Sequence, residues 1–273
     1  MFQQSVPRTT IQSAVNIAEL VYHSIVRNVR KSHGNAILSI LINMLQAFIF
    51  VIAFYVMFTV LGLRSAALRG DFLIYLMSGI FLFLTHTKTL GAVVGSEGPS
   101  SPMMKHAPMN TIISIISAAL GTLYIQVLSL FAILFIYHAA VTPIEIDDPI
   151  GAFGMLLLAW FAGIGIGMVL LALKPWFPTF VSIASTVYQR ANMIASGKMF
   201  VANTLPTFML NMFDWNPLFH CIDQARGYAF INYYPRNSTI TYPLVVATIL
   251  LMLGLMGEFY TRKHVSVSWG ARR

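Results

Sequence analysis

The chain has 273 residues, of which 57% are hydrophobic and 10% are charged, and its mean hydropathy is +0.73. Soluble domains carry about 25% charged residues, so this composition excludes an ordinary soluble protein and indicates an integral membrane protein. The formal net charge of +8 does not indicate nucleic acid as a partner, because Lys and Arg mark the cytoplasmic side of a membrane protein. The single cysteine, Cys221, excludes an internal disulfide.

The first predicted element is an amphipathic helix from Ile11 to Lys31. Apolar residues recur at helical spacing on one face, and polar residues occupy the other. The helix is too polar to span a bilayer, and Arg27, Arg30 and Lys31 gather at its end. We therefore place residues 1–35 in the cytoplasm, with this helix lying in the membrane interface.

Later apolar runs are long enough to cross a bilayer as helices, which takes about 20 residues. The six runs cover residues 36–63, 72–94, 111–138, 150–173, 179–201 and 242–260. The predicted fold class is therefore an all-α integral membrane protein with six transmembrane helices. Its membrane domain covers residues 36–263, and residues 264–273 form a cytoplasmic tail.

The charges between these runs predict the topology. With both termini in the cytoplasm, most Lys and Arg residues fall on the cytoplasmic side and most carboxylates fall outside. The loop at residues 141–149 carries Glu145, Asp147 and Asp148 and no cation. Arg64 and Arg69 are the discordant pair, and they are too few to reverse the balance. The distribution favours an N-in, C-in arrangement.

Polar and small residues inside the runs predict contacts between helices. Asn43 and Gln46 in the first run are expected to face other helices rather than lipid. The second run carries a polar cluster at residues 85–88, which is expected to face the bundle interior or emerge into the cytoplasm. Gly163 and Gly167 form a G-x-x-x-G pattern, which lets another helix approach closely.

The stretch from Arg190 to Phe230 departs from the pattern of ordinary spans. It starts with cations inside an apolar run and contains two short hydrophobic pieces. Irregular backbone at membrane depth is tolerated only where protein or a water-filled cavity surrounds it, so we expect the outer part of a transport path here. The residues assigned to this path are Gln189, Arg190, Lys198, Tyr55 and Phe58.

Arg190 carries the most specific of these expectations. A cation at mid-membrane costs about 3 kcal/mol on insertion scales and normally faces an interior, so we expect Arg190 to point into the helix bundle or into the path. Its partner there is either an anionic group of the transported molecule or an internal group such as a helix-end carbonyl. Lys198 lies closer to the outer interface, where we expect its ammonium group to reach the surface.

The dipeptide Asn216-Pro217 predicts the start of a helix, because Asn caps helix N-termini and Pro suits the first helical position. This helix is expected to run to about residue 231, and a similar apolar piece precedes it at residues 205–213. We expect both to form short re-entrant helices in an outer region, residues 202–238, that covers the path. The residues assigned to this outer gate are Trp215, Asn216, Pro217, His220, Asp223 and Arg226.

The sequence gives no pattern for catalysis or metal binding. Acidic residues are few, and the histidines lack the spacing of a metal site. Ser196-Gly197-Lys198 does not complete the phosphate-binding motif G-x-x-x-x-G-K-[ST], because Asn192 replaces the first Gly and Met199 replaces the final Ser or Thr. We therefore expect no catalytic residue, no metal and no cofactor on this chain, and any ATP must bind to another polypeptide.

In these respects the chain resembles the ABC-2 type permeases, and most closely their capsular polysaccharide exporter branch. The six runs, the N-terminal helix and the broken outer segment carry the likeness in topology. At residue level it rests on Ser196-Gly197, Leu205-Pro206, Trp215-Asn216-Pro217-Leu218, His220, Arg226 and the glycine-rich run FAGIGIGMVLLAL. The chain departs from the family pattern in its fifth run, which is more apolar in relatives and here carries Gln189, Arg190 and Lys198.

This resemblance implies the membrane subunit of an ATP-driven exporter in the bacterial inner membrane. Two copies would pair, and each would dock one cytoplasmic ATPase subunit that holds ATP and magnesium. The cargo would be a lipid-linked surface polysaccharide, handed on to periplasmic and outer-membrane export proteins. Contact with the ATPase is expected from the N-terminal helix and the loop at residues 95–110, through Arg27, Arg30, Glu97, Pro102, Lys105 and His106.

Three alternatives stay open. The cargo of such a permease could be a lipid, a drug or another glycopolymer. An ion-coupled transporter would show an inverted repeat with paired broken helices, which the sequence lacks. A membrane-embedded glycosyl or phosphate transferase would require acidic motifs at a cytoplasmic helix end, where this chain has few carboxylates.

Overall fold

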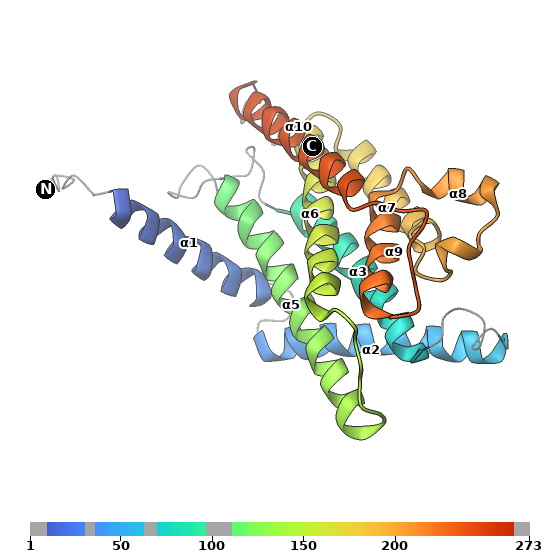
Figure 1. Ribbon diagram of the computed structural model, residues 1–273. Coiled ribbons are helices and arrows are strands. Elements are labelled where there is room, and N and C mark those ends of the chain that lie inside the picture. The colour runs from blue at the N-terminus through green and yellow to red at the C-terminus, as the bar shows by residue number, and fades with distance from the viewer. Residues whose placement is uncertain (1–9, 31–35, 63–69, 97–110, 265–273) are drawn as a thin grey trace, which may run out of the picture.

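The computed structural model describes residues 10–30, 36–62, 70–96 and 111–264, and this part of the chain forms helices without strands (Figure 1). The helices are α1 (Thr10–Arg30), α2 (Ala36–Val60), α3 (Phe72–Val94), α5 (Thr111–Ala140), α6 (Pro149–Leu173), α7 (Pro178–Ala195), η2 (Ala202–Thr204), α8 (Thr207–Phe213), α9 (Pro217–Ala229) and α10 (Thr241–His264). Five of them, α2, α3, α5, α6 and α10, are long and apolar enough to cross a membrane. The all-α prediction is therefore confirmed for the described residues.

Two of the long helices begin at carboxylate caps. Asp71 accepts a hydrogen bond from the Leu73 backbone N–H at 2.8 Å, at the start of α3. Asp148 accepts from the N–H groups of Ile150 and Gly151 at 3.0 and 2.9 Å, at the start of α6. Such caps satisfy N–H groups that the first helical turn leaves without partners, so the short polar loops fix where these apolar helices begin.

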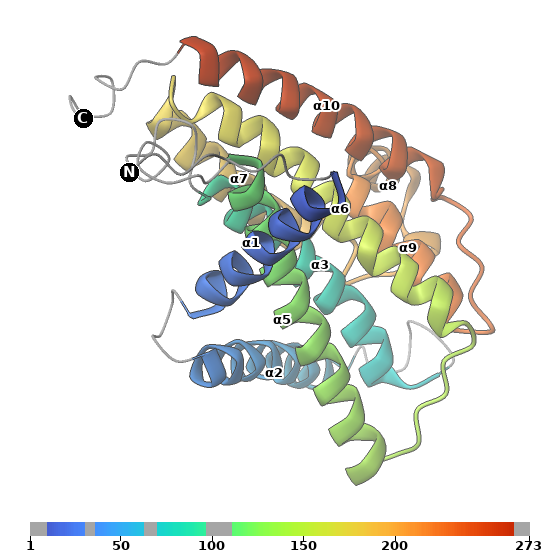
Figure 2. The same cartoon turned by 90° about the vertical axis from the view of Figure 1, so that its left-hand side faces the viewer.

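Helix α6 lies between α3 and α10 and contacts both along its length (Figure 2). A Cβ atom added at Gly163 would lie 2.7 Å from the His86 carbonyl oxygen of α3, and one at Gly167 would lie 2.9 Å from Val93. Gly165 faces the other way, where a Cβ atom would lie 2.8 Å from the Ala247 carbonyl oxygen of α10. The glycine-rich run thus lets two helices approach α6 closely on different faces.

Hydrogen bonds join neighbouring helix ends on two sides of the bundle. At one end, the Tyr137 hydroxyl of α5 donates to Asp71 of α3 at 2.6 Å, and the loop before α6 is hydrogen-bonded to the end of α9. At the other end, the Lys174 ammonium donates to the Val94 carbonyl at 2.7 Å, which joins the ends of α6 and α3. These bonds hold neighbouring helix ends together, and the six-span topology stays a prediction. Which side faces the cytoplasm stays a prediction from charge.

The helices α1 and α2 occupy the periphery of the bundle. The Lys88 ammonium of α3 donates to Asn43 and Gln46 of α2, both at 2.8 Å, so these two polar side chains face a neighbouring helix as expected. Most of the remaining surface of α2 is exposed and apolar. The amphipathic α1 lies against α5, where Val29 is buried. Both views show α2 crossing α5 (Figures 1 and 2).

The expected fifth span, residues 179–201, differs in the structure. Its helix, α7, ends at Ala195 and is not among the five helices that meet the length and hydropathy of a membrane span. Gln189, Arg190 and Asn192 make its second half polar, and the chain then turns at Gly197, whose φ is +78°. The two short helices predicted beyond it are present as α8 and α9. Their depth in a membrane stays a prediction.

Candidate functional site

The backbone directly after α7 folds back onto α3. We call residues 196–201 the Lys198 loop. The loop requires glycine at Gly197, because its φ of +78° is unfavourable for other residues and an added Cβ atom would lie 2.9 Å from the Phe219 ring. It also requires glycine at Gly79 of α3, where a Cβ atom would lie 2.9 Å from the Lys198 Cα. Two glycines therefore allow this irregular segment to lie directly on a spanning helix.

The ammonium group of Lys198 is buried in a cage of aromatic rings. Its side chain is 1% exposed, and its Nζ lies 3.6 Å from the centre of the Phe83 ring, 4.7 Å from Phe50 and 5.0 Å from Phe54. The Nζ has no hydrogen-bond partner among the described residues. Burial without a counter-charge lowers the pKa of Lys198 from 10.5 to about 7. Contacts with the ring faces offset part of the cost of desolvation.

This position corrects a prediction. Lys198 was expected to reach the outer surface, but the Lys198 loop turns inward and places the ammonium group between α2 and α3. The rings that contact the ammonium group are two on α2 and one on α3. Tyr55 and Phe58, which were assigned to the path, contact the Phe72 ring, and their place in a path stays a prediction.

Arg226 of α9 clamps the Lys198 loop. It is 1% exposed, and its guanidinium group donates to the carbonyls of Gly197 at 2.9 Å, Lys198 at 2.9 Å and Phe200 at 2.6 Å. The group also lies 4.3 Å from the centre of the Tyr75 ring. A planar guanidinium has several donors in fixed geometry and stacks on aromatic faces, so one side chain holds three carbonyls of an irregular loop. The predicted gate residue Arg226 thus fixes the position of Lys198.

Asn216 ties the start of α9 to the end of α7. Its Oδ1 accepts from the Leu218 N–H at 3.1 Å, and Pro217 occupies the first helical position, so the predicted helix start is confirmed. Its Nδ2 donates to Asn192 Oδ1 at 2.7 Å and to the Ala195 carbonyl at 3.0 Å. A single amide therefore caps one helix and holds another.

His220 lies within α9 and is almost fully buried. Its Nδ1 accepts from the Thr239 backbone N–H at 3.1 Å. The proton therefore sits on Nε2, which donates to the Asp214 carbonyl at 2.8 Å and lies 3.1 Å from the Asp214 carboxylate. This predicted gate residue joins α9 to the loops on both sides of it.

Asp223 holds the loop that leads to α10. Its carboxylate accepts hydrogen bonds from the Tyr233 hydroxyl and, at 2.7 Å, from the Ser238 hydroxyl. Burial, and then the adjacent carboxylate, raise the pKa of Tyr233 well above its usual range. The hydroxyl therefore stays protonated and keeps donating to Asp223. Trp215, the remaining gate residue, is 81% exposed and lies at the surface beside this network.

Arg190 does not point into the helix bundle of this chain, so of its two expected positions only the path stays a prediction. It is exposed, on the same face of α7 as Ile183, Val187 and Ile194, which are exposed as well. These residues share a face because helical neighbours recur three or four positions apart. Its neighbour Gln189 is half-buried. Of the path residues predicted on α7 and the loop beyond it, only Lys198 reaches the interior.

The predicted coupling residues lie away from this site. Arg27 is exposed on α1. The Arg30 side chain lies outside the described residues, as do Glu97, Pro102, Lys105 and His106. Their assignment to ATPase contact stays a prediction.

A buried polar pair connects α3 to α7, and sequence reasoning did not assign it. His86 Nδ1 donates to the Ala159 carbonyl of α6 at 2.9 Å, so its Nε2 accepts from the Tyr188 hydroxyl of α7, also at 2.9 Å. The polar cluster at residues 85–88 was the signal in the sequence, but the partner on α7 was not identifiable. This pair links three helices at the centre of the bundle.

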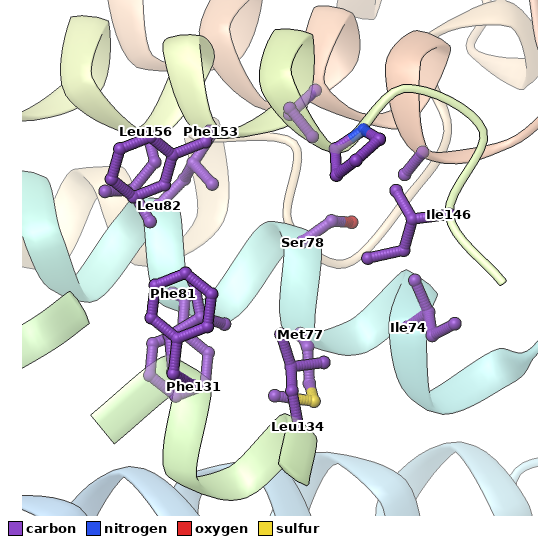
Figure 3. A pocket seen from close by; sticks show the side chains of 15 residues that line it. Ile74, Met77, Ser78, Phe81, Leu82, Phe131, Leu134, Ile146, Phe153 and Leu156 are labelled. Atoms are coloured by element: carbon purple, nitrogen blue, oxygen red, sulfur yellow. The ribbon is translucent and has the colours of Figure 1, made fainter. Parts of the chain in front are cut away.

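An apolar cavity opens between α3, α5, α6 and α9 (Figure 3). Phe81 of α3 and Phe131 of α5 lie at one end of it, and Ile74 and Ile146 lie toward the other (Figure 3). Ser78 supplies its only hydroxyl, which donates to a backbone carbonyl at 2.8 Å. The cavity wall therefore offers almost no hydrogen-bonding group and suits a hydrocarbon chain.

Compared with models of known protein families the chain matches none, and no curated protein is found to match it. In the described part of the chain, no three His, Cys, Asp or Glu side chains gather where they could hold a metal ion. The fold and the site define a class, a multi-pass helical membrane protein with a broken, clamped segment after α7. The family resemblance stays a prediction.

Proposed function

We propose that this chain is the transmembrane subunit of an ATP-driven exporter, which moves a lipid-linked, capsular-type polysaccharide outward across the bacterial inner membrane. In this proposal α7 is the fifth of six crossing helices, both termini lie in the cytoplasm, and α8 and α9 cover the outer end of the path. Two copies form the path. ATP and magnesium bind to separate cytoplasmic subunits.

The observation that carries the proposal is the buried ammonium group of Lys198. It has three aromatic rings around it and no hydrogen-bond partner among the described residues. Ionisable groups inside membrane proteins are costly and mark substrate or ion pathways. A phosphate or an acidic sugar of the cargo would supply the counter-charge that the described protein does not. The ammonium group is therefore the proposed contact for an anionic cargo.

The attachment of α7 supports a way of exposing this group. The helix is held to α3 by the hydrogen bond between Tyr188 and His86, and to α9 by the hydrogen bond between Asn192 and Asn216. Because the Lys198 loop continues directly from α7, a movement of α7 away from α3 would draw the ammonium group off the rings. The exposed face that carries Arg190 would then meet the second copy across the path.

The apolar cavity supports a cargo with a lipid part. It lies on a different face of α3 from Lys198, because Ile74 and Phe81 line the cavity while Tyr75 and Phe83 contact the Lys198 loop and its clamp. A lipid-linked glycan would thus find a hydrocarbon site and a cationic site on one helix. The same pair of sites favours a second candidate function, export of an anionic lipid without a glycan.

Affinity purification from the native membrane tests the proposal. An ATPase subunit should remain bound to the chain through detergent extraction, and the complex should hydrolyse ATP. A strain without the chain should then show which cargo is retained. Stable transport by the chain with no ATPase bound would contradict the exporter proposal, and retention of a lipid without glycan would favour the second candidate.

A further inference from the structure

A polar pocket lies beside α8, at the end of the molecule that the charge distribution places outside. Its polar lining includes Asn211, Asp214, His220, Arg236, Asn237 and Thr239. The pocket is distinct from the apolar cavity of Figure 3, with which it shares no lining residue. The exposed side chains of the polar pocket have no role in the export path proposed above.

The floor of this pocket is fixed by hydrogen bonds within the protein. His220 binds both the Thr239 N–H and the Asp214 carbonyl, which joins the two walls. Behind them the Ser238 hydroxyl donates to Asp223 at 2.7 Å, and Gln224 donates to the Ser238 carbonyl at 2.8 Å. A site held by buried partners of this kind needs little reorganisation when a ligand binds.

The rim presents both donors and acceptors to solvent. The side chains of Asn211, Asp214, Arg236, Asn237 and Thr239 belong to exposed residues. Amide and hydroxyl groups both donate and accept hydrogen bonds, as the hydroxyl groups of a sugar do. The carboxylate of Asp214 and the guanidinium group of Arg236 offset each other, and His220 is neutral in this arrangement, so the pocket has no net charge to attract a polyanion.

One aromatic side chain, Tyr242, completes the lining. Its ring lies in the pocket wall 4.7 Å from that of His220, and its hydroxyl donates to the Trp215 carbonyl at 3.0 Å. The C–H face of a pyranose is apolar and suits an aromatic face, while its hydroxyl edge suits the amides and charges of the rim.

We infer that this pocket binds neutral sugar units, and that it contacts the glycan after the glycan has passed the Lys198 loop. This role in export rests on the proposed function. The two sites divide the cargo by chemistry: the buried ammonium group takes its anionic part and the outer pocket takes its neutral sugars. The pocket is thereby an exit site on the outer surface.

Binding of oligosaccharides to the purified chain in lipid nanodiscs tests the inference. The probes are the neutral oligosaccharides maltoheptaose, cellohexaose and mannohexaose, and the acidic hyaluronan hexasaccharide, followed by saturation-transfer NMR and by Trp fluorescence. We expect at least one neutral probe to bind with a Kd on the order of 1 mM, within the range of weak complexes. We expect this Kd to change little between about 50 and 500 mM salt, because the interaction involves no net charge.

Variants link the binding to the pocket. Asp214→Ala and Asn237→Ala should each weaken the binding about tenfold, as expected for the loss of one or two hydrogen bonds to a ligand. Glu145→Ala is the control, because it removes an exposed carboxylate from a loop at the same end of the molecule. The backbone carbonyl of Asp214 still accepts from His220 in its variant, so the pocket floor should persist.

Three results would overturn the inference: no neutral probe binds, both pocket variants bind as the wild type does, or hyaluronan binds more tightly than every neutral probe in a salt-dependent way. Failure of the exporter proposal is a separate outcome. If no ATPase accompanies the chain but neutral sugars still bind in this pocket, the sugar site is supported and its role in export is contradicted. If the ATPase is present and no sugar binds, the inference alone fails.

Discussion

Replacing Lys198 by Met removes the buried charge and keeps an unbranched side chain that is one atom shorter. Arg226 binds the backbone carbonyls of the Lys198 loop, so its hydrogen bonds do not depend on the substituted side chain. The lowering of the Lys198 pKa from 10.5 to about 7 corresponds to about 5 kcal/mol against the charged form. At pH 7 about half of the folded protein still carries the charge, so most of this cost is present. We therefore expect Lys198→Met to raise the free energy of unfolding by about 4 kcal/mol at neutral pH.

The effect should depend on pH with a definite sign. Lys198 loses its proton near pH 7 in the folded protein and near pH 10.5 in the unfolded chain. Between these values the unfolded chain binds more protons, so the stability of the wild type rises with pH by up to about 1.4 kcal/mol per pH unit. Below the folded pKa the whole penalty is present. The variant lacks this contribution, so the two proteins should approach each other in stability as the pH rises.

Unfolding followed in nanodiscs between about pH 6 and pH 9, the window in which most of this change falls, measures both quantities. Lys263→Met is the matched control, because Lys263 is exposed at the end of α10, and it should change neither the stability nor its slope with pH. In the cell, Lys198→Met should fold and fail to export, because the variant lacks the proposed cargo contact. A variant that is less stable than the wild type at neutral pH, or that keeps the same slope, would refute the reasoning.

Further predictions concern the clamp and the contact between α3 and α6. Arg226→Ala removes three hydrogen bonds to the Lys198 loop and should lower the free energy of unfolding by about 3 kcal/mol. Arg226→Lys should recover only part of this loss of stability, because an ammonium group lacks the fork geometry of a guanidinium group. Equal stability of the two variants in denaturant would contradict the role of Arg226 as a clamp. Gly163→Ala places a Cβ atom 2.7 Å from the His86 carbonyl and should cost about 2 kcal/mol or more. Gly154→Ala is the control on the same helix, since nothing lies within 4 Å of its added Cβ atom, and it should be neutral or stabilising by up to about 1 kcal/mol. Thermal unfolding that ranks the two glycine variants in the opposite order would contradict the close approach of α3 and α6.

The limits of most helices follow from local features of the sequence. The expected second run and α3 both cover residues 72–94, because an apolar run, an Asp cap and a final Gly coincide there. The start of α9 at Pro217 follows from the Asn216 cap in the same way. Such signals act within one helical turn, so a single sequence is enough to detect them.

The positions of the two cations depend on contacts that are distant in sequence. Lys198 is buried because the Lys198 loop packs on Gly79 and Phe83 of α3 and is clamped by Arg226 of α9. The sequence around residue 198 contains no signal of either contact. Arg190 was predicted to face the bundle or the path from the average cost of a membrane cation, and this cost does not distinguish the two. Its helical neighbours at three and four residues' distance, such as Val187 and Ile194, could have indicated the face that stays exposed.

The most direct test of the central claim is the location of surface polysaccharide in a bacterial strain from which this chain has been deleted. The account predicts that lipid-linked glycan accumulates on the cytoplasmic side of the inner membrane, that the wild-type chain restores export, and that Lys198→Met, although present and folded in the membrane, does not. A deletion strain that displays its usual polysaccharide on the cell surface, with none retained inside, would contradict the account.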